Sequence, residues 1–265
     1  MRKADRVGII GLGYVGGAVR NWFENKKKSK PALFFYDKFK NIGSVEEVNV
    51  ADFIFVCVPT PYHEDGRGYD DSAVVDALSN IKKSKTAIIK STVVPGSTEK
   101  YQKMFPYLRI LFNPEFLVAK TANDDFLKPD RQIVGYTPKS LSRAKQALKL
   151  LPKAHFTKIV PAAEAEMAKY FCNTFLSARV VFANQIYDVC EKMGINYEAV
   201  KEMAGADPRI GKSHFDIFHD GYRGYGGLCL PKDTKAFIDF VSEAGLKPKL
   251  HKALEEINEE LRKKH

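Results

Sequence analysis

A cysteine in the segment Tyr225–Asp233 has the sequence surroundings of a reactive thiol. Cys229 follows a glycine-rich stretch and comes two residues before Pro231, a residue type favoured at the first position of a helix. We expect that helix to end at Gly245. The positive end of the helix dipole and the nearby Lys232 would both stabilise a thiolate, the reactive form of cysteine. The alternative is a small cysteine buried under a tight loop, which is the commoner environment of this residue type outside disulfides.

A glycine motif near the N-terminus predicts a dinucleotide site. Gly11, Gly13 and Gly16 form a GxGxxG pattern between a predicted strand and a predicted helix. Glycines at these positions permit a tight turn, close approach of a pyrophosphate and close helix–strand packing, and the helix N-terminus supplies N–H groups. The next strand ends at Asp37, 21 residues after Gly16, where a carboxylate binds a ribose 2′-hydroxyl. This favours NAD over NADP, although Lys38 beside it is a residue type that accepts a 2′-phosphate. The alternative is a glycine-rich turn with an unrelated aspartate.

Short β-branched runs alternate with helical patterns over residues 1–160. The alternation predicts an α/β domain of the Rossmann type, in which a doubly wound parallel sheet is covered on both faces. Expected strands are Arg6–Ile10, Ala32–Tyr36, Phe53–Val58, Thr86–Lys90, Arg109–Phe112, Gln132–Gly135 and one around His155–Ile159. Expected helices are Tyr14–Asn25, Ser72–Ile81 and Lys139–Leu150.

From residue 161 to 265 the pattern becomes that of an all-α central domain. A helix is predicted over Ala162–Met193, because apolar residues recur there at helical spacing. Its apolar face is larger than a small helical domain covers, so we expect a homodimer that uses it. A helix at Tyr197–Met203, a loop over Gly205–Leu230 and two terminal helices follow. Loops of that length are usually functional.

Composition excludes several classes of protein. The chain of 265 residues is 45% hydrophobic and 28% charged, as in soluble globular proteins. No apolar run approaches the ~20 residues of a membrane span, and strand and glycine motif follow the N-terminus too closely for a signal peptide. Four widely spaced cysteines favour a reducing cytoplasm over a disulfide framework. The net charge of +10 comes with lysine clusters that lack interleaved aromatics, which argues against nucleic-acid binding. Two histidines and two aspartates (His214, Asp216, His219, Asp220) have no standard metal-site spacing, so no metal is expected.

Seven motifs, taken together and in order, resemble the UDP-glucose/GDP-mannose dehydrogenase family. Most are individually unspecific, but they extend from the glycine motif to the C-terminal helices. That family oxidises the C6 alcohol of a nucleotide sugar to a carboxylate with two NAD and a cysteine. The matching segments are Gly11–Gly16, Cys57–Pro61, Ser91–Gly96, Asn113–Leu117, Lys169 with Asn173, Arg209–Gly211 and Cys229–Asp233.

The resemblance implies a role for each reactive residue. Cys229 would capture the aldehyde intermediate as a thiohemiacetal, which is oxidised to a thioester and then hydrolysed. Asp233 would serve as a general base or act through water in the alcohol step. Lys169 and Asn173, four residues apart on one helix face, would stabilise oxyanions. The positions of Thr92 and Glu115 hold or activate the hydrolytic water. Without the resemblance, Lys169 could be a surface lysine and Asn173 a polar residue within a helix. Thr92 could likewise be a turn residue.

The binding residues implied by the resemblance fall into two groups. Cofactor contacts are expected from Gly11, Gly13, Tyr14, Val15, Gly16, Asp37, Pro59, Thr60 and Thr92. Contacts to a nucleotide sugar, with UDP-glucose as the expected substrate, are expected from Glu115, Phe116, Leu117, Lys169, Asn173, Arg209, Tyr225 and Gly226, with Arg209 reaching the neighbouring subunit. Two departures from the family are Ala119, where a second glutamate is common, and the lack of a third, C-terminal domain that binds the nucleotide.

Two other functions stay open. A 3-hydroxyacid or 6-phosphogluconate-type dehydrogenase also joins a nucleotide-binding domain to a helical one and uses a lysine, but its chemistry needs no thiol. A non-catalytic NAD-binding module derived from the family is the second alternative. Replacement of Cys229 by serine would separate the first alternative from the leading hypothesis.

Overall fold

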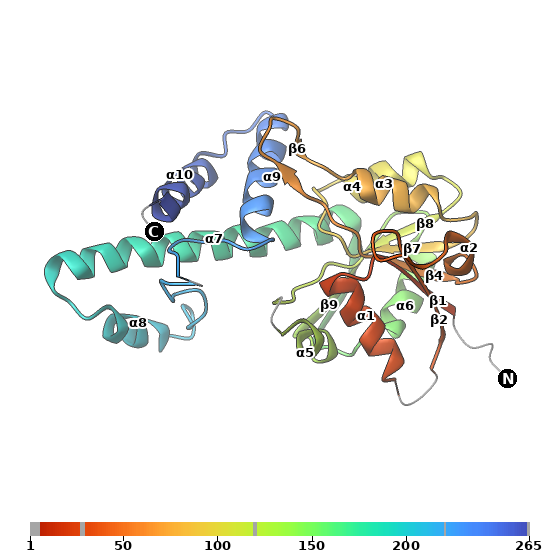
Figure 1. Cartoon of the computed structure of the whole chain (residues 1–265), viewed down its shortest axis with the longest axis horizontal. Helices are drawn as coiled ribbons and strands as arrows, with labels where there is room; N and C mark the ends of the chain where they lie inside the picture. Colours follow the sequence, from red (N-terminus) through yellow and green to blue (C-terminus); the bar gives the residue numbers. More distant parts are fainter. Residues whose placement is uncertain (1–5, 27–29, 119–120, 220, 264–265) are drawn as a thin grey trace. The chain divides into compact units, whose positions relative to one another are not determined.

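The computed structural model describes residues 6–26, 30–118, 121–219 and 221–263. The chain divides into two compact units, the first containing Met1–Pro61 and Asp70–Lys169 and the second containing Tyr62–Tyr69 and Tyr170–His265. These limits differ from a boundary between residues 160 and 161, and the domain limits expected from the sequence remain a prediction. Figure 1 shows the helices and strands of both units.

The first unit is built on an eight-stranded, mostly parallel sheet. Five neighbouring strands, β2, β1, β4, β7 and β8, run parallel, while β9 is antiparallel to β8 and β3 is antiparallel to β2. The order is β10-β9-β8-β7-β4-β1-β2-β3. The predicted doubly wound sheet is confirmed, but it is mixed at both edges. The strands are β1 (Arg6–Ile10), β2 (Ala32–Asp37), β3 (Ile42–Gly43), β4 (Phe53–Val56), β7 (Thr86–Ile89), β8 (Arg109–Phe112), β9 (Arg131–Tyr136) and β10 (Phe156–Pro161).

Both faces of this sheet are buried under helices, as Figure 1 shows. In β4, Phe53 and Phe55 belong to one core, and Ile54 and Val56 belong to the other. Burial on both faces explains why the central strands are continuous apolar runs. One face is covered by α1 (Tyr14–Glu24), α5 (Ala122–Leu127) and α6 (Leu141–Leu150), and the other by α2 (Val45–Val48), α3 (Ser72–Ser79) and α4 (Ser97–Met104).

The carboxyl ends of the parallel strands share one edge of the sheet. The glycine turn after β1, Asp37 at the end of β2, and the loops after β4, β7 and β8 all lie at that edge. The strand order reverses between β1 and β4, which is where open α/β sheets bind ligands. The topology therefore places the predicted cofactor residues at a common edge.

The second unit is largely helical. It contains residues 170–193 of the 32-residue α7 (Ala162–Met193), together with α8 (Tyr197–Gly205), α9 (Leu230–Glu243) and α10 (Lys249–Lys263). It also includes a hairpin of β5 (Tyr62–His63) and β6 (Gly68–Tyr69), which sequence analysis missed because two-residue strands carry no periodic pattern. None of the helices in the described part of the chain has the length and apolarity to span a membrane.

Two arginines anchor the long loop between α8 and α9. Arg179 of α7 donates to the carbonyl oxygens of Ile210 and Ser213 at 2.7 Å each. The buried Arg223 donates to Asn184 Oδ1 at 2.9 Å and pairs with Asp188 at 2.6 Å. The loop is therefore held against α7 at two points despite its lack of regular structure.

Candidate active site

The glycine turn after β1 has the local geometry of a dinucleotide site. Gly11 has φ of 85°, a region that L side chains rarely adopt. A Cβ on Gly16 would lie 1.8 Å from the carbonyl oxygen of Gly11, so only glycine lets α1 start this close to the turn. By contrast, a Cβ on Gly13 would meet nothing within 4 Å, and no side chain caps α1 there. The first N–H groups of α1 are therefore not occupied by a capping side chain, which suits a phosphate.

Asp37 is fixed beside this turn. Its carboxylate accepts the Leu12 N–H at 2.7 Å and the Lys40 N–H at 2.9 Å. Burial raises its pKa, but these hydrogen bonds and the Lys40 charge outweigh burial and hold the pKa of Asp37 below its ordinary value. The carboxylate lines a cavity of about 450 Å³, whose wall also contains Tyr14, Val15, Lys38 and Pro59. These residues fit a dinucleotide, with Asp37 ionised for a ribose hydroxyl.

The loops after β4 and β7 are joined by hydrogen bonds. Thr60 donates to the Thr92 carbonyl oxygen at 2.9 Å, and Ser91 donates to the Val58 carbonyl oxygen at 2.6 Å. Thr60 and Thr92 are both buried. These hydrogen bonds therefore fix the two loops, and the predicted cofactor residues on them, relative to each other.

Glu166 is a structural partner of this region that sequence analysis missed. Its carboxylate accepts the N–H groups of Gly96 at 2.6 Å and Thr98 at 2.8 Å, and the Thr98 hydroxyl at 2.6 Å. It thereby caps the N-terminus of α4 and fixes the end of the loop that begins at Thr92. Burial raises the pKa of Glu166 above its ordinary value despite these three bonds. Because the partners are about 70 residues away, the sequence carries no local signal of this role.

Glu115 and Lys169 form a buried ion pair within the first unit. Lys169 Nζ lies 3.1 Å from Glu115 Oε1, and the Leu117 N–H donates to Glu115 Oε2 at 2.8 Å. Burial would raise the pKa of Glu115, but the Lys169 charge and the Leu117 bond together lower it. Glu115 is therefore a carboxylate at neutral pH, with an ammonium on one of its oxygens.

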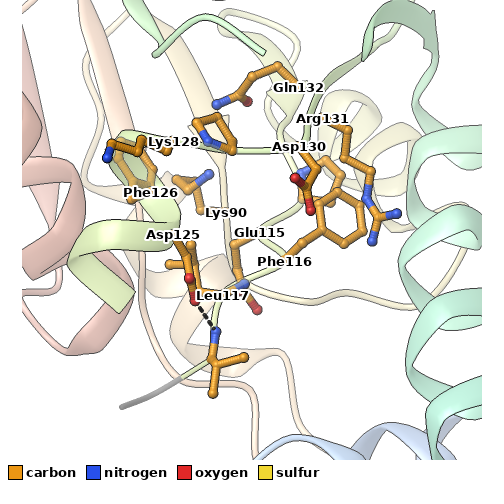
Figure 2. A pocket seen from close by; sticks show the side chains of 13 residues that line it. Lys90, Glu115, Phe116, Leu117, Asp125, Phe126, Lys128, Asp130, Arg131 and Gln132 are labelled. Atoms are coloured by element: carbon orange, nitrogen blue, oxygen red, sulfur yellow. Dashed lines mark hydrogen bonds between the residues drawn. The ribbon is translucent and has the colours of Figure 1, made fainter. Parts of the chain in front are cut away.

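A cavity of about 240 Å³ adjoins Glu115. Figure 2 shows that Glu115, Phe116 and Leu117 line it together with Lys90 and Arg131. The Arg131 guanidinium lies 3.9 Å from the Phe116 ring centroid, which holds that ring in place. Lys90 was not among the predicted site residues, although a lysine at the end of an otherwise apolar strand is an unusual feature that pointed to it.

In the second unit, Asn173 and Asp233 are in direct contact. Asn173 Nδ2 donates to Asp233 Oδ2 at 2.5 Å, and Lys232 donates to Asp233 Oδ1. Asp233 is only 1% exposed. The pair therefore forms a rigid polar element one helical turn from Cys229.

Cys229 is exposed at the N-terminal end of α9. Its carbonyl oxygen accepts the Asp233 N–H at 3.0 Å, which closes the first helical turn. The alternative of a cysteine buried under a loop does not hold. The helix begins at Leu230, so Pro231 is its second residue and not its first, and Gly245 has φ of 76° just beyond the helix end.

The remaining predicted substrate residues have different environments. Tyr225 is buried, its hydroxyl donates to Glu255 at 2.6 Å, and Asn258 bonds to its backbone N–H and carbonyl oxygen at 2.7 and 3.1 Å. The structure gives Tyr225 an anchoring role, and a substrate contact by Tyr225 or by Gly226 beside it stays a prediction. Arg209 is exposed and paired with Asp207 at 2.6 Å.

Two expectations concern residues that the structure does not describe. Ala119 and Asp220 lie outside the described residues. Within the described ranges, no three histidine, cysteine, aspartate or glutamate side chains are grouped so that they could hold a metal ion. The burial of His214 lowers its pKa, which suits a packed loop residue.

Comparisons with known proteins show similarity over most of the chain. Residues 34–151 match the NAD binding domain of the UDP-glucose/GDP-mannose dehydrogenase family, and residues 163–260 match its central domain. UDP-glucose 6-dehydrogenase of Rickettsia prowazekii is 35% identical over 82% of this chain, which spans about half (51%) of that protein. The Campylobacter jejuni UDP-glucose 6-dehydrogenase is 30% identical over 98% of this chain and 73% of its own. A UDP-glucose dehydrogenase structure from Pyrobaculum islandicum has a TM-score of 0.83 and 28% identity, covering 98% of this chain and 69% of that one.

A glycine turn after the first strand, with a carboxylate beside it at the end of the second strand of a doubly wound sheet, is typical of dinucleotide-binding proteins. The sequence matches over both domains identify the family within this class of protein. The chain belongs to the UDP-glucose/GDP-mannose dehydrogenase family, a family of NAD-dependent oxidoreductases, and NAD is its cofactor.

Proposed function

We propose that the protein oxidises the C6 alcohol of a nucleotide sugar, UDP-glucose, to the uronate through a covalent intermediate on Cys229. The observation that carries the proposal is an exposed cysteine at the positive end of α9, one turn from the buried Asn173–Asp233 pair. The names of the relatives support this class of substrate. The thiol also separates this function from a 3-hydroxyacid dehydrogenase, because a simple alcohol oxidation has no use for it.

The chemistry requires two oxidations and one hydrolysis. NAD held at the glycine turn would supply the hydride acceptor, one molecule for the first oxidation and a second molecule for the next. Asp233, directly or through water, takes the proton of the C6 hydroxyl in the first. The Cys229 thiolate then adds to the aldehyde carbon, and Lys169 and Asn173 stabilise the oxygen anion that forms. Loss of the second hydride turns the thiohemiacetal into a thioester.

Hydrolysis completes the sequence. Burial would raise the pKa of Glu115, but Lys169 and the Leu117 N–H offset this effect, so Glu115 is ionised at neutral pH. An ionised carboxylate has a free oxygen lone pair that can accept a proton from water. With Thr92 holding that water, the hydroxide adds to the thioester carbon, and the sulfur leaves as a thiolate. The products are the uronate carboxylate and the regenerated Cys229. In this scheme Phe116, Leu117, Tyr225 and Gly226 bind the sugar, and Arg209 contacts the neighbouring subunit's substrate.

We also propose a homodimer in the cytoplasm. Large apolar side chains are exposed along one stripe of α7 in the second unit, at Phe171, Phe175, Phe182 and Val189. Exposed apolar stripes of this kind are typical of protein–protein interfaces. No disulfide joins the four cysteines, all of which are described, and this is usual in a reducing compartment.

The test combines purified protein, NAD and a panel of nucleotide sugars, with the absorbance of reduced nicotinamide as the readout. Turnover with UDP-glucose in a ratio of two reduced cofactors per sugar is expected. The Cys229→Ser variant should stop before release of the uronate. Full activity of that variant would favour a 3-hydroxyacid-type dehydrogenase, whereas NAD binding without turnover of any sugar would favour a non-catalytic module.

A further inference from the structure

Lys90 is a buried ammonium beside the ion pair of Glu115 and Lys169. It lies at the carboxyl end of β7, is 2% exposed and lines the same cavity as Glu115 (Figure 2). Its Nζ donates to Asn113 Oδ1 at 2.7 Å and to the Asn113 carbonyl oxygen at 3.2 Å. Burying an ammonium costs free energy unless the group is well solvated by other dipoles. A neutral or apolar residue would fill this place at lower cost, so the charge itself calls for an explanation.

The hydrogen bonds of Lys90 end on a residue that begins the Glu115 loop. Asn113 follows β8 directly, and its amide nitrogen donates to the Ile133 carbonyl oxygen at 2.7 Å and to Gln132 Oε1 at 3.3 Å. The side-chain oxygen of Asn113 is thus bonded to Lys90, which directly follows β7, and its side-chain nitrogen is bonded to β9. Lys90 therefore fixes the point from which the chain enters Pro114–Leu117.

The electrostatic surroundings of Lys90 are mixed. Burial lowers its pKa to about 8, while the Glu115 carboxylate raises that pKa and the Lys169 ammonium lowers it. The nearby Cys57 thiol carries no charge near neutral pH, because burial raises its pKa to about 12. Lys128, Asp130, Arg131 and Asp125 face the same cavity from the segment between α5 and β9. Near neutral pH most of the Lys90 population is an ammonium. Together with Lys169 it contributes positive charge that lowers the pKa of Glu115.

We propose that Lys90 is a positioning residue for Glu115: through Asn113 it fixes the loop Pro114–Leu117, and it places a second positive charge near the Glu115 carboxylate. This inference rests on the proposed function, in which Glu115 activates the hydrolytic water. Lys90 acts through Asn113 and through its field, and it takes no proton in the reaction.

Two substitutions separate the two parts of the proposal. Lys90→Gln removes the charge but keeps a donor for Asn113, while Lys90→Met removes both. The Glu115 carboxyl, followed by carbon-13 NMR in the full chain, should bind protons about threefold or more tightly in both variants. The Leu117 amide, which donates to Glu115, should exchange with solvent about tenfold faster in Lys90→Met but near the original rate in Lys90→Gln.

Lys128→Met is the matched control, because the same substitution removes an exposed ammonium from the same cavity. It should leave Leu117 exchange unchanged and shift Glu115 proton binding less than Lys90→Met does. NAD binding and a cooperative thermal transition show that each variant is folded. If the Glu115 titration is the same in Lys90→Met, Lys90→Gln and the unmodified protein, Lys90 is only a structural lysine and the proposal is wrong.

A separate experiment measures the effect of Lys90 on the reaction. If the unmodified protein turns over, the Lys90→Met variant should accumulate the Cys229 thioester, which mass spectrometry detects. The reason is that a displaced Glu115 would slow hydrolysis more than it slows oxidation. An unmodified protein without turnover would contradict the proposed function, whereas the NMR and exchange measurements would still decide whether Lys90 positions Glu115.

Discussion

Lys169 Nζ lies 3.1 Å from Glu115 Oε1, and the two side chains are 5% and 10% exposed. A buried pair of this kind is costly to break, because the remaining charge has no partner. The ion pair connects the N-terminal part of α7 to the loop that follows β8. It also makes the ionisation of Glu115 depend on a single neighbouring ammonium more than on any other group.

The first prediction concerns stability. Lys169→Met should lower the free energy of unfolding by about 3–5 kcal/mol at neutral pH, because Glu115 stays buried without its partner. The double variant Lys169→Met/Glu115→Gln should recover most of that loss, since both charges are gone. Urea denaturation of the full chain measures both values. Equal stability of the single and double variants would show that the unpaired Glu115 charge costs nothing, which would contradict this prediction.

The same pair gives a pH dependence whose sign follows from the lowered pKa of Glu115. The folded-state pKa is below the unfolded value of about 4.3. The pair therefore adds stability above that pH, and the stability is lost as the pH falls through the folded-state pKa. Glu115→Gln lacks this contribution, so its stability should fall less than that of the unmodified protein between about pH 5 and about pH 3.

The second prediction concerns the cofactor. Asp37→Ala should weaken NAD binding by about tenfold or more, because a charge-assisted hydrogen bond to the ribose is worth about 1.5–3 kcal/mol. Discrimination against NADP should weaken as well, since the carboxylate that repels a 2′-phosphate is gone. Isothermal titration with both cofactors measures both effects. Equal affinities for NAD and NADP in the unmodified protein would contradict the role of Asp37.

Local patterns predicted the strands of the first unit except the two-residue β3. They were clearest for the central strands β4, β7 and β8, because burial on both faces leaves unbroken apolar runs. The turn after β1 and the position of Asp37 were also readable, since each residue type there serves a local conformational need. In contrast, Lys90, Glu166 and Asn258 act across 23, about 70 and 33 residues. Nothing beside them in the sequence indicates the partner, so only the folded chain shows their roles.

The third prediction concerns assembly. If the apolar stripe of α7 forms a dimer, Phe175→Glu or Phe182→Glu should give a monomer, because a carboxylate would be buried without a partner at the interface. Multi-angle light scattering at micromolar concentration gives the mass directly. Phe39→Glu, at an exposed phenylalanine in the first unit, should leave the mass unchanged. A monomeric unmodified protein would count decisively against the dimer.

The last prediction concerns the reactivity of the four cysteines. Iodoacetamide reacts with thiolates, and the N-terminal end of a helix stabilises the thiolate form. Cys229 is exposed there, whereas Cys190 is buried and burial raises the pKa of Cys57 to about 12. At pH values near neutrality, peptide mass spectrometry should therefore find Cys229 alkylated first and Cys57 last. The Cys229→Ser variant should lose the fast phase of alkylation and keep the slow phases of the other cysteines. Cys229 should react fastest whether or not NAD is present. If Cys229 reacts no faster than Cys172, a half-buried residue of α7, it lacks the activation that a nucleophile needs, and the covalent mechanism would have to be abandoned.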